Sequence, residues 1–467
     1  MKRPLPIAST TAPRHLLAVF LTGFLLLPGT AQDGFEPSGN PALERYIGLA
    51  LESNLGLRQK QLDYAQDLAA LQEARGLFFP DVSLHARYTV ANGGRRIEFP
   101  VGDMLNPVYS TLNMLTSSTT FPQIENESFA FYRAREHETK LSLVQPIYSA
   151  ELIQNQKIRK EQLELTRIGV EQYRRELVRE VTLAYHAWAG ARQMLALADS
   201  TLALVRENLR VSRRLFENDK VTVDAVYRSE TELSRVLAQK AAARTGVESA
   251  RAYFNFLLNR ELQEDIELVE PEPWQPRTDV DEATARALAA RLELDQLDGG
   301  IRLNDHVAKA YRGNNLPGLY GVVDYGFQGE EYRFTGEDDF VLASLVLSWD
   351  LFQGSANRNK VQQARIERDK LLNRKAEAEQ QIRLQVIRQH HALLAAWDAV
   401  QSTRMEVRSA RRAYELIARR FEEGQASLLE LIDARTALTG AESRAIGARG
   451  EYFATYAEYE YVIGSSL

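Results

Sequence analysis

The chain has 467 residues, a net charge of −6 and no cysteine. A charge this small for the length gives no sign of a nucleic-acid partner, and the missing cysteines exclude disulfides and a lipid-modified N-terminal cysteine. We find no phosphate loop, nucleophile elbow or dinucleotide fingerprint, and Leu141 stands where a zinc-protease motif starting at His137 needs its second histidine. The sequence therefore predicts a protein that is not an enzyme, with no cofactor and no metal site.

The N-terminal segment has the order of an export signal. Basic residues precede an uncharged apolar run over 16–27, which Pro28 breaks, and small residues up to Ala31 suit a signal peptidase. We predict that residues 1–31 are a signal peptide; a buried N-terminal helix is the alternative. No later segment approaches eighteen apolar residues, so we expect any crossing of a membrane to use strands closed into a barrel.

A helical pattern begins near residue 41, and the hydrophobic period changes at Pro80, a residue that cannot continue a helix. Over 81–90, apolar and polar residues alternate, which predicts a strand with one apolar and one polar face. Residues 91–137 are rich in Ser, Thr, Asn and Pro and predict a long outer loop between this strand and a second one.

Two very long helical patterns follow the strands. Residues 150–216 contain no proline, and apolar positions recur at three- and four-residue steps, which predicts one continuous helix about 100 Å long. A second helix is predicted over 223–258. Helices of this length need neighbours along their whole length, so packed coiled-coil pairs are expected.

The second half repeats the first. Residues 261–281, acidic and proline-rich, form the predicted linker, which we expect to wrap the helices at mid-height. Three sequence anchors recur in the same order and indicate a tandem duplication. They divide the chain into a first repeat, 41–260, and a second, 282–467. The second repeat is predicted to contain a helix, two strands over 318–352 and long helices over 356–421 and 428–462.

Aromatic residues stand at or near the predicted strand ends, where a membrane-interface girdle would place them: Tyr88, Tyr148, Tyr325 and Trp349. An ordinary half-buried sheet explains the alternation equally well. Four strands of membrane type cannot close a barrel with a lumen, and an open sheet in lipid leaves unpaired edges. A cyclic homo-oligomer would pair them, although the strands do not fix the number of copies.

The turns between the paired helices contain residues suited to end one helix and start the next. Gly424 can take the left-handed conformation that ends a helix, and Ser427 is placed to cap the next helix. In the first repeat Asp219 replaces the glycine and Thr222 takes the capping position. Asp tolerates the left-handed conformation better than most residues, so both turns are plausible.

Three stretches carry a family resemblance: 141–148, the Leu-x-x-x-Trp-Asp-Leu-Phe-x-Gly sequence of 345–354, and the turn over 420–435. Together they resemble the TolC family of outer-membrane efflux proteins. The resemblance covers the whole mature chain. It implies a mainly α fold with a transmembrane β portion, which assembles as a homotrimer into a twelve-stranded outer-membrane β-barrel continued across the periplasm by an α-helical barrel.

The resemblance also implies a function. The tip of the helical barrel would meet a periplasmic adaptor protein and an inner-membrane pump, as the passive exit duct of a tripartite efflux or type I secretion system. A non-transporting envelope stalk or adhesion protein is the alternative; it would share the helices and the export signal without needing the duplication or an acidic tip. The cargo, whether drugs, metals or proteins, is left open.

Glu430 and Asp433 match two acidic positions that ring the periplasmic entrance in the family and favour cations. In the first repeat the corresponding acidic residue is displaced by one position, to Asp224. The alternative for Glu430 is a capping-box carboxylate at a helix start.

Phe421 and Ala426 stand where the family has the tyrosine and arginine that lock the closed tip. Because neither side chain can make those polar bonds, we hypothesise that packing of Phe216 and Phe421 holds the tip instead.

Overall fold

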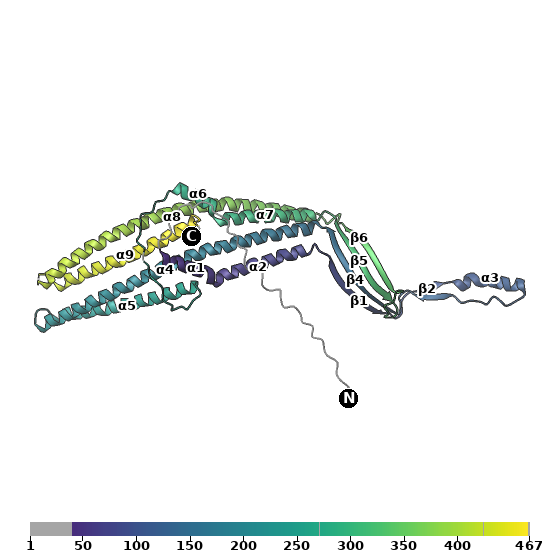
Figure 1. Cartoon of the computed structure of the whole chain (residues 1–467), viewed down its shortest axis with the longest axis horizontal. Helices are drawn as coiled ribbons and strands as arrows, with labels where there is room; N and C mark the ends of the chain where they lie inside the picture. The colour runs from purple at the N-terminus through teal and green to yellow at the C-terminus, as the bar shows by residue number, and fades with distance from the viewer. Residues whose placement is uncertain (1–39, 270, 424, 466–467) are drawn as a thin grey trace, which may run out of the picture.

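The computed structural model describes residues 40–465 except 270 and 424, so the signal-peptide prediction for 1–31 lies outside the described residues. The fold is mainly α with one four-stranded sheet, as predicted. The molecule is elongated: paired helices form one end, the sheet follows, and a narrow extension continues beyond it (Figure 1). In the part of the chain described, no helix combines the length and apolarity needed to cross a membrane.

The two repeats contain the same elements in the same order, apart from the extension that follows β1. In the first repeat these are α1 (Pro41–Ser53), α2 (Leu55–Gly76), β1 (Asp81–Val90), β4 (Arg135–Tyr148), α4 (Ala150–Glu217) and α5 (Val223–Leu257). In the second they are α6 (Val280–Ala290), α7 (Leu292–Gly313), β5 (Gly318–Gly329), β6 (Asp339–Ser348), α8 (Ala356–Glu422) and α9 (Leu428–Val462). The four long helices match their predicted ranges to within one residue.

The helix that enters each repeat is broken in two, which the sequence pattern did not predict. Asn54 is extended between α1 and α2; its side-chain oxygen accepts from the Leu57 N–H, 2.9 Å away, and caps α2. Its amide nitrogen donates to the Leu257 carbonyl at the end of α5, 2.9 Å away. In the second repeat Arg291 makes the break, and its guanidinium donates to the Val462 carbonyl at the end of α9.

The segment 91–137, which the sequence predicts as a long outer loop, has secondary structure of its own. It contains β2 (Arg96–Phe99), α3 (Val101–Thr116) and β3 (Glu127–Ala130), and β4 already begins at Arg135. The reason lies in the asparagines. The side chain of Asn106 both donates to and accepts from the backbone of Ile124, at 2.9 Å each, and Asn113 does the same with Phe121. Residues typical of loops therefore clamp a helix against the segment 121–124, which returns toward β3.

The sheet is antiparallel with the order β1-β4-β5-β6. Residues paired across it lie in rows on one face, and one such row is Leu84, Leu141, Tyr325 and Val341. The neighbouring rows on the opposite face pair Ser83 with Ser142 and Asp324, and His85 with Lys140, so the predicted polar face extends from β1 to β4 and β5. On β6 this face carries Leu342 instead. In the described part of the chain, the outer edges of β1 and β6 have no strand partner.

The four predicted interface aromatics lie at three different heights along the sheet. Tyr148 ends β4 and Trp349 follows β6, so both lie at the helical end of the sheet, where the Trp349 indole N–H donates to the Asn315 carbonyl at 3.0 Å. Tyr88 lies near the outer end. Tyr325 lies in mid-sheet, level with Leu84, so its expected position near a strand end was wrong. All four side chains are exposed in the single chain.

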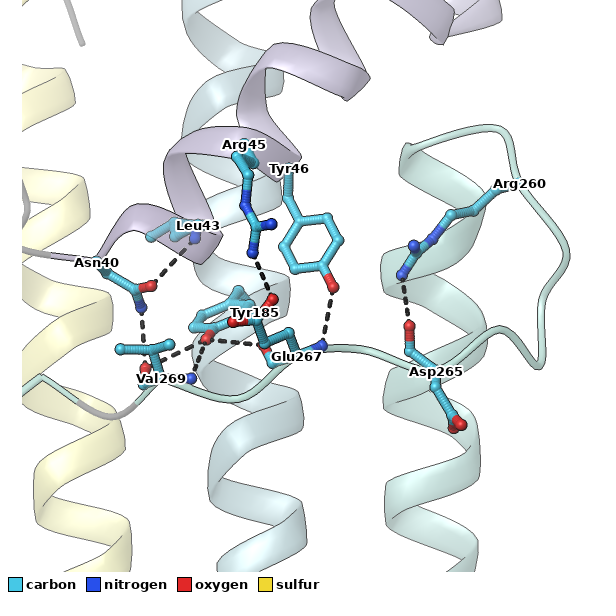
Figure 2. A network of polar contacts seen from close by, with 9 residues as sticks. All are labelled: Asn40, Leu43, Arg45, Tyr46, Tyr185, Arg260, Asp265, Glu267 and Val269. Carbon is cyan, nitrogen blue, oxygen red and sulfur yellow. Dashed lines mark hydrogen bonds and ion pairs between the residues drawn. The ribbon is translucent and has the colours of Figure 1, made fainter.

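The linker crosses the helical part of the molecule, from the end of α5 to α6 (Figure 1), and is held by buried tyrosines. The Tyr185 hydroxyl accepts from the Val269 N–H at 2.9 Å and lies 3.2 Å from the carbonyls of Glu267 and Val269. The Tyr46 hydroxyl accepts from the Glu267 N–H at 2.8 Å, and Asn40 donates to the Val269 carbonyl at 3.0 Å (Figure 2). These bonds pair backbone N–H and C=O groups of Glu267 and Val269, which do not belong to a sheet.

Two aromatic cores flank the linker crossing. The first surrounds Tyr185 and Trp188 in the first repeat, and the second surrounds Tyr452 and Leu393 in the second. His186 connects them by stacking on Phe453, with ring centroids 4.6 Å apart and planes within 6°. Burial lowers the pKa of His186 to about 4, so the ring is neutral at ordinary pH.

Replacing Tyr185 with Phe removes the hydroxyl while keeping the packed ring, so the linker loses its acceptor for Val269 and one donor. We expect a loss of stability of about 1–3 kcal/mol and faster proteolysis between residues 261 and 281. Thermal unfolding and limited proteolysis measure the two effects. The matched control is Tyr253→Phe, whose ring is half exposed and whose hydroxyl makes only a 3.4 Å contact with Glu180; an equal effect there would contradict the assignment.

Candidate functional site

Two helical turns lie at the end of the molecule farthest from the sheet (Figure 1). In the turn between α4 and α5, Asp219 has φ +56°, which confirms its expected left-handed conformation. The Lys220 N–H then donates to the Leu215 carbonyl at 2.8 Å and closes α4. In the turn between α8 and α9, Gly424 lies outside the described residues, and the Gln425 N–H donates to the Arg420 carbonyl at 2.7 Å.

The two turns start their second helices differently. Ser427 and Glu430 form a capping box: the Ser427 N–H donates to the Glu430 carboxylate at 2.7 Å, and the Glu430 N–H donates to the Ser427 hydroxyl at 3.2 Å. The N–H of Ser427 lowers the pKa of Glu430 and favours its charged form. Thr222 occupies the capping position of α5 but makes no cap bond, because its hydroxyl donates to the carboxylate of Asp224.

The three predicted acidic residues all lie at this end of the chain. Glu430 and Asp433 are exposed on the first two turns of α9. Asp224 is exposed on the first turn of α5, where its carboxylate lies 3.6 Å from Arg228. The single chain thus brings Glu430 and Asp433 together on one hairpin and leaves Asp224 on the other.

The packing expected of Phe216 and Phe421 is not present within one chain. Among the described residues, no ring contact joins them, and Phe216 is 42% exposed. The reason is that each ring sits on a different helical hairpin. The hypothesis that these rings hold the tip therefore stays a prediction, which contacts between copies would have to fulfil.

An ion pair that sequence reasoning missed connects the two hairpins instead. The Arg435 guanidinium on α9 bonds to the Glu232 carboxylate on α5, and their side chains are only 2% and 13% exposed. Glu232 also accepts from Arg235 one turn further along α5, at 2.6 Å and 2.8 Å. The hydrogen bond from Arg235 and, to a smaller extent, the charge of Arg435 lower the pKa of Glu232. The carboxylate therefore stays charged beside the two cations.

The sequence held a signal for this pair. Leu431, Arg435 and Leu438 recur at steps of four and three and share the buried face of α9. A charge on an apolar helical stripe needs a buried partner, because an unpaired buried ion costs several kcal/mol. A cavity of about 420 Å³ lies between α4, α5 and α9. The ion pair contributes to its lining, together with Thr201 and Thr439.

A second missed cluster lies on the polar face of the sheet. Asp324 receives bonds from Lys140 at 2.8 Å and from Ser142 at 2.6 Å, and Glu138 lies 3.1 Å from Arg87 and 3.6 Å from Lys140. Extending the period-two reading from β1 to β4 and β5 would have found it. Within the described ranges, no group of three or more His, Asp or Glu is arranged to hold a metal ion.

Comparison with known proteins agrees with this architecture. Residues 283–464 match the model of the family described as outer membrane efflux protein. No curated protein matches the chain at the sequence level.

Solved structures resemble nearly the whole chain. A membrane protein from Pseudomonas aeruginosa is 18% identical with a TM-score of 0.72, covering 91% of this chain and 94% of its own. The Campylobacter jejuni CmeC outer membrane channel is 14% identical with a TM-score of 0.75, covering 91% and 86%. The open state of the Neisseria gonorrhoeae MtrE outer membrane channel is 17% identical with a TM-score of 0.71, covering 91% and 89%. These likenesses establish the fold.

Glu232→Gln leaves the Arg435 charge buried without a full counter-charge, so we expect a loss of stability of about 3 kcal/mol and easier proteolysis near the turns. A Glu232→Leu, Arg435→Met double variant removes both charges and should recover most of the loss. Glu230→Gln is the matched control on the same helix, because its pair with Arg213 is exposed. Thermal unfolding measures all three; a double variant as unstable as the single one would disprove the coupling.

Proposed function

Because residues 283–464 belong to the outer membrane efflux protein family and the whole chain has the fold of solved outer-membrane channels, we propose that the protein is the exit duct of a tripartite efflux or type I secretion system. The protein is located in the outer membrane and extends into the periplasm, and it is a conduit rather than an enzyme. It gives passage to substrates that an inner-membrane pump and a periplasmic adaptor deliver.

The unpaired edges of the sheet support an oligomeric duct. β1 and β6 lie at opposite edges of one four-stranded sheet, and each is ten residues long. A strand of that length, tilted, suits the thickness of a bilayer. In lipid each free edge must be paired, and pairing β6 of one copy with β1 of the next does so for every copy in a closed ring. Three copies supply twelve strands.

The two faces of the sheet suit the two sides of such a barrel. The exposed face carries Leu84, Tyr325 and Val341, 46–70% exposed in the single chain, which lipid would cover. The other face carries the cluster around Asp324 and Lys140, which needs water or partners. A stalk without transport would not need a polar interior, so this cluster favours the duct over the stalk or adhesion protein.

Deletion of the gene tests the duct against the stalk. We expect the deletion strain to lose resistance to toxic compounds or to retain a normally secreted protein, because the exit step is missing. Complementation with the wild-type chain should restore the lost property. A strain normal in both susceptibility and secretion, yet altered in adhesion, would favour the stalk. A photo-crosslinker at the exposed Gln425 then identifies the adaptor or pump at the tip.

The acidic pair at the tip is proposed as a cation-favouring ring, with Asp224 as a third contributor from each chain. Glu430→Gln with Asp433→Asn removes two charges per copy, and Gln at this position still supports a capping box. We therefore expect an intact fold with lower cation selectivity and altered conductance in planar bilayers. Glu451→Gln, exposed on the far half of α9, is the control. Unchanged conductance and selectivity in the double variant would show that the pair is not the gate.

A further inference from the structure

The extension formed by β2, α3 and β3 leaves the outer end of the sheet between β1 and β4 and points away from the helices (Figure 1). The second repeat has no equivalent, since β5 and β6 are joined by residues 330–338 alone. A 16-residue helix held beyond the sheet is close to the length at which isolated helices are only marginally stable in water. Its neighbours therefore decide whether it forms.

One side of α3 packs against the segment 121–124, which returns toward β3. Asn106 and Asn113 bond the backbone of that segment, as described above, and the ring centroids of Tyr109 and Phe121 lie 5.7 Å apart. Gly102 allows the closest approach, because a Cβ there would lie 2.4 Å from the Ile124 carbonyl oxygen. This side of the helix is therefore already occupied.

A second side of α3 is largely open in the single chain: Leu105, Val108 and Leu115 are exposed, and Val101 and Leu112 are only partly buried. Its apolar residues follow steps of four, three, four and three, the spacing of a coiled-coil seam: Val101, Leu105, Val108, Leu112 and Leu115. Val108 is 52% exposed and Leu115 is 77% exposed. The helix carries a single charged residue, Asp103, whereas a helix facing water on this side would carry more.

We propose that this α3 seam, named here for those five residues, packs against the α3 seams of neighbouring copies above the outer opening of the duct. The inference rests on the proposed oligomer. It commits to a second copy because the extension continues from β1, whose free edge is the one that the next copy pairs. Pairing of the sheet edges would place the α3 helices of neighbouring copies at the same height beyond the sheet. A heptad seam can pack against a copy of itself.

The charges of the extension argue against a lipid headgroup surface as the partner. From residue 97 to 132, the part of the extension that contains α3, the sequence has no Lys or Arg and four acidic residues; the basic residues Arg95, Arg96 and Arg133 stand only where the extension leaves β1 and returns to β4. Such a segment has no cation to offer a phosphate group and would be repelled by an anionic surface. In the seam, Leu105 and Leu112 take the a positions and Val101 and Val108 the d positions, and Leu at a with a β-branched residue at d favours more than two strands.

The absence of cysteine makes the test direct, since a single introduced cysteine has no competitor. Val108→Cys places a thiol within the α3 seam. Ser110→Cys places one on the same helix, exposed and outside the seam. Under mild oxidation of the full-length oligomer, we expect a disulfide-linked dimer as the main product for Val108→Cys and monomer for Ser110→Cys, because a disulfide requires Cβ atoms about 3.5–4.5 Å apart.

Light scattering of both unoxidised variants shows whether the oligomer itself forms, which separates this inference from the proposed function. If the variants are oligomeric but form no disulfide at either position, or equal amounts at both, the α3 interface is disproved while the duct stands. If they are monomeric, the oligomer fails and the α3 interface fails with it. Circular dichroism matched to the unaltered chain excludes misfolding as the cause of either result.

Discussion

The unpaired edges of the four-stranded sheet are the constraint on which the rest of the structure depends. Every backbone N–H and C=O on those edges must find a partner, and inside a bilayer water cannot supply one. The division of the sheet into an apolar and a polar face fits the proposed duct, in which lipid would cover one side and water would fill the other. The long helices α4 and α8 start within two to eight residues of a strand end, so the position of each strand also determines where its helix begins.

The long helices need packing partners along their whole length, and no single partner helix is long enough to provide them. α4 packs on α2 and α7 along one half and on α5 along the other, and α8 packs on α7 and α9. The partner helices meet end to end at Asn54 and Arg291, whose side chains bond the last carbonyls of α5 and α9. Each long helix is thus supported along its length by shorter helices placed end to end. The linker covers this junction and is held by the hydroxyls of Tyr46 and Tyr185.

Much of this architecture was predictable because it is periodic. The long helices, the alternating strands and the duplication are repeated signals, and Asp219 and Ser427 follow local turn chemistry that needs no tertiary information. The errors lie where a residue acts through a distant partner. Asn106 and Asn113 indicated a loop by composition but clamp a helix, and Arg435 was read as part of a motif although its role depends on Glu232, some 200 residues away. The expected position of Tyr325 was wrong because the alternation predicts which face of the sheet a residue lies on, but not how far it lies from the end of its strand.

The nearly equal lengths of the long helices in the two repeats, with 68 and 67 residues in α4 and α8 and 35 in both α5 and α9, have a consequence for symmetry. In a ring of three chains the helical end would present six almost equivalent hairpins, an approximate sixfold arrangement. The outer end would not, because only the first repeat carries the extension with α3. The same assembly would therefore show near-sixfold symmetry to a periplasmic protein and strict threefold symmetry to the cell exterior, with two alternating kinds of groove between its hairpins.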